Sequence, residues 1–319
     1  MPATDATRHG EAGMSLGERL QGNHILVAVT GSPDSAAPAI VAHALARRYA
    51  ATVSVVQVLD ISNAALPTPL PSAFAAAREL IGDAPYAEDV RARREQFAEI
   101  LGEPNDWPVH IAVGTPASEI LRYAGAHHPA LIVMGIRRHG AVDRVLRDET
   151  TLSVARRARV AVLGVVPGLR GLPSTGVVGV DFGPASVRAA RAALDVLAPP
   201  SPTAPTTLHL VYVNARAGDA SREDTAGEAL VHRLGVTSAF EQLVRELGAP
   251  PGVTVVPTVR NGPVASELLA FATEQRADLV SIGSLRHERF ERWILGSVTT
   301  QVVRDGRCSV LVIPPERQD

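Results

Sequence analysis

The sequence contains no lysine, and all 31 of its basic residues are arginine. This absence excludes enzymes that need a P-loop lysine, a Schiff-base lysine or a pyridoxal-phosphate anchor. The single cysteine, Cys308, excludes an internal disulfide and a cysteine-based metal site. The histidines form no H-E-x-x-H motif, so no metal site is expected. The formal net charge of −2 gives no electrostatic reason to expect a nucleic-acid or membrane partner.

Aromatic residues make up only 4% of the 319 residues, whereas apolar residues as a whole make up 46%. The core must therefore consist largely of Val, Leu, Ile and Ala. No apolar run approaches the roughly 18 residues of a membrane span, and the amino terminus has no apolar signal-peptide region. We therefore expect a soluble, cytoplasmic protein, and the length suggests two domains of ordinary size.

The chain repeats one order of strand and helix patterns. A strand at 25–29, a helix at 36–49 and a strand at 52–59 form the first βαβ unit. Because parallel strands need such a crossover, the order predicts an α/β fold with a parallel sheet in each half. The further predicted strands are 109–113, 131–134, 160–166, 177–180, 208–213, 253–259, 279–282 and 309–313. The further predicted helices are about 73–101, 116–124, 185–197, about 225–247, a helix from 264 to about 275, and one that opens at 296.

The two halves also align residue by residue. Ala117–Leu121 matches Ala265–Leu269, and Leu131–Gly135 matches Leu279–Gly283, both at an offset of 148 residues. This indicates a tandem duplication of a whole domain. We expect a disordered tail at 1–21, a first domain at 22–167, a Gly/Pro-rich linker at 168–175 and a second domain at 176–315.

The strongest functional pattern lies near the end of the second half. An apolar strand ends at Gly283, a polar loop follows, and Gly296-Ser297 opens a helix. A strand that leads through a loop into a helix amino terminus suits phosphate, because exposed backbone N–H groups and the helix dipole favour an anion. The first half keeps Gly135 but has Asp148-Glu149 where the second has Gly296-Ser297.

From about residue 23 to 315, both halves resemble the universal stress protein family. The resemblance implies a five-stranded parallel sheet flanked by helices, a Rossmann-like fold of the adenine-nucleotide alpha-hydrolase type. Nucleotide-binding members carry a Gly, two residues, Gly, nine residues, then Gly-Ser or Gly-Thr, and an Asp at the end of the first strand.

By this resemblance, Gly283 and Gly296-Ser297 match the two ends of the pattern, and Asp181 matches the strand-end Asp that contacts the adenosine. Arg286 stands at the second Gly of the pattern. Its side chain either blocks the loop or reaches the phosphates directly. The remaining candidates for the nucleotide site are Tyr212, Ile282, Val298 and Thr299.

The first half departs further from the pattern. Thr30 stands at the Asp position, Arg138 at the second Gly, and Asp148-Glu149 at the closing pair. Because two carboxylates repel a triphosphate, we expect a degenerate nucleotide site in this domain.

The resemblance therefore implies a non-catalytic stress-response protein whose second domain binds ATP or a related adenine nucleotide as a regulatory ligand. Two alternatives stay open: a scaffold with both pockets degenerate, and slow ATP hydrolysis. The paired domains are expected to form an intramolecular pseudo-dimer through 160–166 and 309–313, and the sequence leaves a homodimer of the whole chain open.

Overall fold

The computed structural model describes residues 14–29, 36–60, 87–136, 149–199, 201, 205–215, 226–284 and 295–315. The chain is α/β, as the sequence predicts, and divides into two compact units. The first unit is Glu18–Gly171. The second comprises Leu172–Asp319 together with the amino-terminal segment Met1–Gly17.

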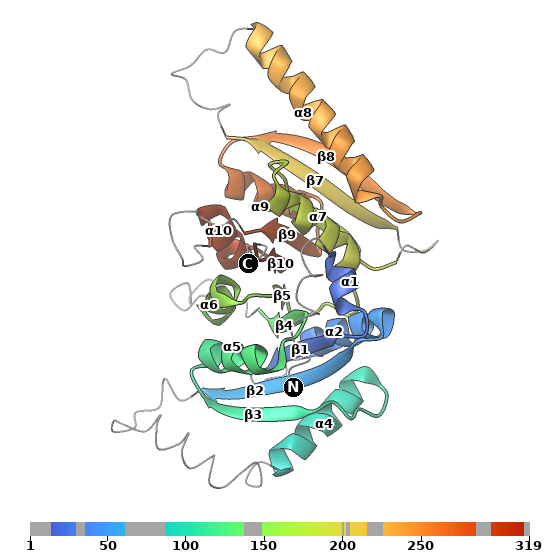
Figure 1. Cartoon of the computed structure of the whole chain (residues 1–319), viewed down its shortest axis with the longest axis vertical. Coiled ribbons are helices and arrows are strands. Elements are labelled where there is room, and N and C mark those ends of the chain that lie inside the picture. Colours follow the sequence, from blue (N-terminus) through green and yellow to red (C-terminus); the bar gives the residue numbers. More distant parts are fainter. Residues whose placement is uncertain are drawn as a thin grey trace, which may run out of the picture. The chain divides into compact units, whose positions relative to one another are not determined.

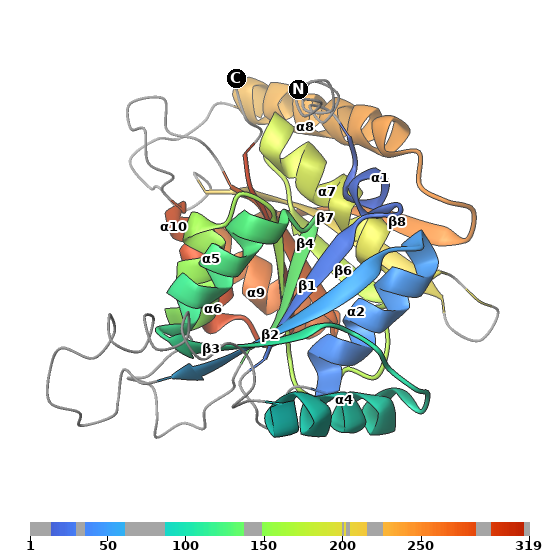
Figure 2. The same cartoon turned by 60° about the horizontal axis from the view of Figure 1, so that its bottom comes forward.

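The first unit contains a parallel sheet with the strand order β3-β2-β1-β4-β5. Its strands are apolar over consecutive residues because both faces of a parallel sheet are covered by helices. Helices α5 and α6 pack against each other on one face of the sheet. Helices α2 and α4 form a second packed pair, apart from the first (Figure 2). The strands are β1 (His24–Val29), β2 (Thr52–Asp60), β3 (Val109–Gly114), β4 (Leu131–Gly135) and β5 (Ala161–Val165), and the helices are α2 (Ala36–Tyr49), α4 (Ala87–Leu101), α5 (Pro116–His127) and α6 (Glu149–Arg157).

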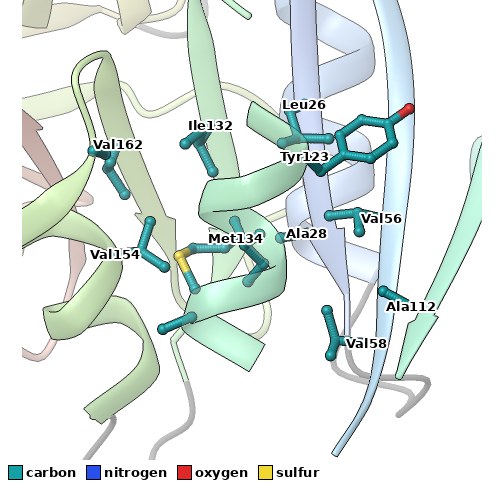
Figure 3. Close-up of a cluster of buried hydrophobic side chains, with 13 residues drawn as sticks. Leu26, Ala28, Val56, Val58, Ala112, Tyr123, Ile132, Met134, Val154 and Val162 are labelled. Atoms are coloured by element: carbon teal, nitrogen blue, oxygen red, sulfur yellow. The ribbon is translucent and has the colours of Figure 1, made fainter. Parts of the chain in front are cut away.

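The core between this sheet and helices α5 and α6 is made of small and branched side chains. Leu26, Ile132 and Val154 are fully buried, and Met134 lies among them (Figure 3). Tyr123 is the one aromatic side chain of this cluster. Because aromatic residues are scarce, closely packed Val, Ile, Leu and Ala side chains fill this core.

The second unit repeats the arrangement with the order β10-β9-β6-β7-β8, all pairs parallel. α7 packs against α8, and α9 packs against α10 (Figure 1). α5, β4, α6 and β5 begin 148 residues before α9, β9, α10 and β10, the offset found in the sequence. The strands are β6 (Thr175–Gly179), β7 (Thr206–Asn214), β8 (Val253–Asn261), β9 (Leu279–Gly283) and β10 (Ser309–Ile313), and the helices are α7 (Pro184–Val196), α8 (Ala226–Leu247), α9 (Val264–Glu274) and α10 (Ser297–Asp305).

One sequence prediction needs correction. Within the tail predicted to be disordered, Leu16–Leu20 forms helix α1, and Leu16 and Leu20 are buried. The polar, small-residue composition hid these two apolar anchors, which lie one helical turn apart. The helix predicted at about 73–101 is observed over Ala87–Leu101, and residues 61–86 lie outside the described part of the chain.

No helix in the described part of the chain is both long and apolar enough to cross a membrane.

Candidate functional site

The candidate site of the second unit lies at the carboxyl edge of its sheet. β6 and β9 are neighbours, paired at Val178↔Ser281, but the strands that follow them continue toward opposite sides of the sheet. Such a reversal of strand order is the usual ligand site of open α/β sheets, because the connecting loops diverge there. Asp181, just beyond β6, and Gly283, the last residue of β9, stand at this reversal.

Asp181 organises the turn that starts α7. Its Oδ1 accepts a hydrogen bond from the Gly183 N–H at 2.9 Å, and the Ser186 hydroxyl donates to the Gly183 carbonyl at 3.0 Å. The Asp181 N–H in turn donates to the Ser186 hydroxyl oxygen at 3.3 Å. This Asx turn fixes one carboxylate oxygen. Asp181 is exposed, and no described residue donates to its Oδ2, so this oxygen can accept from a ligand hydroxyl.

Gly283 has a packing role that the sequence did not reveal. A Cβ at this position would lie 2.3 Å from the carbonyl oxygen of Ala185 and 2.5 Å from its carbonyl carbon. Only glycine therefore lets the end of β9 approach the first turn of α7 so closely. The glycine that the family pattern assigns to phosphate contact is needed here for the fold itself.

Helix α10 begins without a side-chain cap. Gly296 is its N-cap, in an ordinary conformation (φ −57°), and makes no side-chain cap hydrogen bond. Gly296 and Ser297 are both exposed, and a Cβ on Gly296 would meet no described atom within 4 Å. The first N–H groups of an α-helix have no intrahelical acceptor, and here they start next to an exposed serine, an arrangement that suits an anion.

The other predicted site residues differ in exposure. Ile282 is buried in β9, where it is paired with Val312, and Thr299 is buried in the first turn of α10. Val298 is half-buried. Arg286 lies outside the described residues, as do Thr30, Arg138 and Asp148 of the first half. In that half, helix α6 begins at Glu149, where α10 begins at Ser297.

Tyr212 belongs to an aromatic group that sequence reasoning missed. Its ring stacks on Phe182 with a centroid distance of 5.4 Å, and the rings of Phe182 and Phe240 form a T-shaped pair at 5.0 Å between centroids. Phe182 has φ +63°, a conformation rare for a residue with a side chain. No local pattern signals this group, because its members come from three separate elements.

Arg260, at the end of β8, has charge partners within the unit. Its guanidinium bonds Glu267 at 3.0 Å and Glu274 at 3.0 and 3.1 Å. The hydrogen bond to Glu267, followed by those to Glu274, raises the pKa of Arg260. These contacts compete with any role in phosphate binding.

Within the described residues, no three His, Cys, Asp or Glu side chains gather in a way that could hold a metal ion.

The fold defines an α/β protein with two Rossmann-like units. The model of the universal stress protein family matches twice, over residues 22–166 and 176–314. The chain belongs to the universal stress protein family, and it carries two domains of this family in tandem.

The similar proteins agree with this assignment. Universal stress protein C of Salmonella typhimurium is 33% identical over 147 residues, covering 44% of this chain and 92% of that protein. A universal stress protein of Methanocaldococcus jannaschii is 30% identical over 76 residues, a match that spans only 45% of that protein and 24% of this chain. The crystal structure of a universal stress protein from Archaeoglobus fulgidus has a TM-score of 0.61 and 19% identity, covering 92% of this chain and 99% of that chain, a likeness of fold.

Proposed function

We propose that this protein is a non-catalytic, stress-response protein whose second domain binds ATP or a related adenine nucleotide as a regulatory ligand. The observation that carries the proposal is the exposed start of α10, where Ser297 is exposed and a Cβ on Gly296 would meet no described atom within 4 Å. This helix follows β9 at the strand-order reversal, where the free Oδ2 of Asp181 can accept from a ribose hydroxyl.

The proposed roles follow from these positions. The N–H groups at the start of α10 and the Ser297 hydroxyl would hold phosphate, and Asp181 would hold the sugar. Gly283 would act indirectly, by seating the end of β9 against α7. None of the described residues of this site supplies a nucleophile with an adjacent base, which favours a regulatory role for the nucleotide over hydrolysis.

The substitution Gly296→Leu tests the proposal. Its side chain would extend into the space assigned to phosphate while meeting no described atom of the fold, so stability should be retained. Radiolabelled ATP should bind the wild-type chain with a stoichiometry near one, and Gly296→Leu should abolish binding with little change in Tm. Unchanged ATP affinity in this variant would contradict the assigned site.

A regulatory ligand should also change the association of the chain. Light scattering with and without ATP measures whether the nucleotide alters self-association. An identical mass in both conditions would direct the search toward a different partner protein.

One observation favours a second candidate, a nucleotide-independent scaffold. Asp181 and Gly283 both serve the fold, through the Gly183 N–H and the close contact with Ala185. Their presence alone therefore does not require a ligand. A thermal-shift screen in which no adenine nucleotide raises Tm would favour the scaffold.

A further inference from the structure

The second unit gathers three of the chain's few aromatic side chains at the edge that holds the candidate site. The protein has 6 Phe, 4 Tyr and 2 Trp in 319 residues. The Phe182 ring nevertheless contacts both the Tyr212 ring and the Phe240 ring, at 5.4 and 5.0 Å between centroids. They come from the turn after β6, from β7 and from α8. We call this group the aromatic wall.

The wall is placed next to the sugar position. Phe182 directly follows Asp181, whose carboxylate is fixed by the Asx turn. Tyr212 lies on β7 one residue beyond Val211, which accepts a hydrogen bond at 2.9 Å from the Val180 N–H just before Asp181. A nucleoside whose sugar contacts Asp181 therefore has its base within reach of these rings.

The backbone conformation of Phe182 is a separate observation. Its φ of +63° is costly for a residue with a Cβ and persists only where the surroundings impose it. This conformation accompanies the contacts of the Phe182 ring with Tyr212 and with Phe240. Phe240 is buried, whereas Phe182 and Tyr212 are half-buried, so both of these residues keep part of their surface exposed.

The first unit has a polar pair in the corresponding place. In the alignment of the two halves Thr30 corresponds to Asp181, and the strand registers then make Gln57 the equivalent of Tyr212. Gln57 accepts a hydrogen bond from the Arg93 Nε at 3.0 Å. Arg93 lies on α4, the helix between the second and third strands of the first unit. Helix α8, which carries Phe240, has the same place in the second unit. The wall thus occurs in the unit that keeps the nucleotide pattern.

We infer that Phe182 and Tyr212 form the base-stacking surface of the nucleotide site, with Phe240 supporting them from behind. This inference rests on the proposed function and adds how the base is recognised. Aromatic stacking accepts any base because every base has a π-face. Stacking of this kind would hold guanine as well as the adenine of the proposed function, so the second domain should bind adenine and guanine nucleotides with similar affinity and discriminate both from ligands without a base.

Calorimetric titration of the full chain with ATP, GTP and inorganic tripolyphosphate tests the inference. For the wild type, ATP and GTP should bind within about fivefold of each other, and both at least tenfold more tightly than tripolyphosphate. Phe182→Leu and Tyr212→Leu should each weaken ATP binding about tenfold or more while leaving tripolyphosphate binding unchanged. Tyr49→Leu, which removes a half-buried aromatic ring from α2 of the first unit, is the matched control and should leave all three affinities unchanged.

The outcomes separate the two proposals. If the wild type binds ATP and neither Phe182→Leu nor Tyr212→Leu weakens it, the stacking surface is wrong and the proposed function stands. A preference for ATP over GTP above a hundredfold also overturns stacking as the mode of recognition. If the wild type binds no nucleotide, both proposals are wrong. Should Phe182→Leu fail to fold, Tyr212→Leu decides the question.

Discussion

Gly283 lies so close to Ala185 that a Cβ on residue 283 would be 2.3 Å from the Ala185 carbonyl oxygen. The end of β9 and the first turn of α7 are therefore in direct backbone contact. Contacts this short cannot be relieved by a side-chain rotation, because the opposing atoms belong to the main chain.

Gly283→Ala should therefore destabilise the second unit, by about 1–3 kcal/mol or more, because α7 or β9 must shift. The measurement is the Tm of the ligand-free protein. The matched control is Gly296→Ala, which places a methyl group in open space at φ −57° and should cost less than about 1 kcal/mol as a weaker N-cap. Equal Tm values for the two variants would contradict the packing role of Gly283.

Both domains keep a glycine with positive φ where the third strand ends, Gly114 as the last residue of β3 and Gly262 directly after β8. Gly114 has φ +150° and Gly262 has φ +134°, and a Cβ on either would lie 3.2 or 3.1 Å from the Cγ of Glu119 or Glu267. Gly114→Ala and Gly262→Ala should each lower stability by about 1–3 kcal/mol.

Gly125→Ala is the control for this pair. Gly125 lies within α5 and a Cβ there would meet nothing within 4 Å, so the substitution should raise stability by about 0.5–1 kcal/mol. Chemical denaturation measures all three. A neutral result at both 114 and 262 would show that the turns relax without cost.

Asp278 joins the start of β6 to β9. Its Oδ2 accepts hydrogen bonds from the Ser174 N–H and hydroxyl, both at 2.9 Å, and from the Thr175 N–H at 3.1 Å. Asp278→Ala leaves these donors without an acceptor and should cost about 1–3 kcal/mol in the free energy of unfolding.

The comparison for Asp278→Ala is Glu95→Ala, which breaks an exposed ion pair with Arg91. That change should cost less than about 0.5 kcal/mol, because exposed pairs contribute little. If Asp278→Ala lowered the free energy of unfolding no more than Glu95→Ala, the Asp278 carboxylate would not be what holds the start of β6.

His209 should make the second unit sensitive to acid. It is buried on β7 against the ring of Phe271, at 5.3 Å between centroids, and its Nδ1 has no hydrogen-bond partner among the described residues. Burial lowers the pKa of His209 below its ordinary value of 6.5. The unfolded chain therefore binds a proton more readily than the folded one, and stability falls as the pH drops below about 6.5.

The measurement is Tm between pH 7.5 and pH 5. His209→Leu should lose less Tm over this range than the wild type. His24→Leu is a useful comparison, because burial also lowers the pKa of His24, but in the first unit. An identical pH dependence of wild type and His209→Leu would contradict the role of His209.

The periodic features of the chain could be predicted before the structure. Apolar runs such as Leu131–Gly135 and Leu279–Gly283 marked buried parallel strands, and their constant offset revealed the duplication. The positions of Asp181 at a strand end and of Ser297 at a helix start were also predictable, since a local pattern fixes each. Helix α1 was missed because its signal is only two apolar residues, Leu16 and Leu20.

The sequence by itself determined the α/β fold and the tandem duplication, because these depend on residues close together in the chain. Only the tertiary structure decided that Gly283 faces the backbone of Ala185, and that Phe182, Tyr212 and Phe240 meet at one edge of the sheet. Those contacts join residues far apart in sequence, and the packing of strands and helices, rather than any local pattern, brings them together.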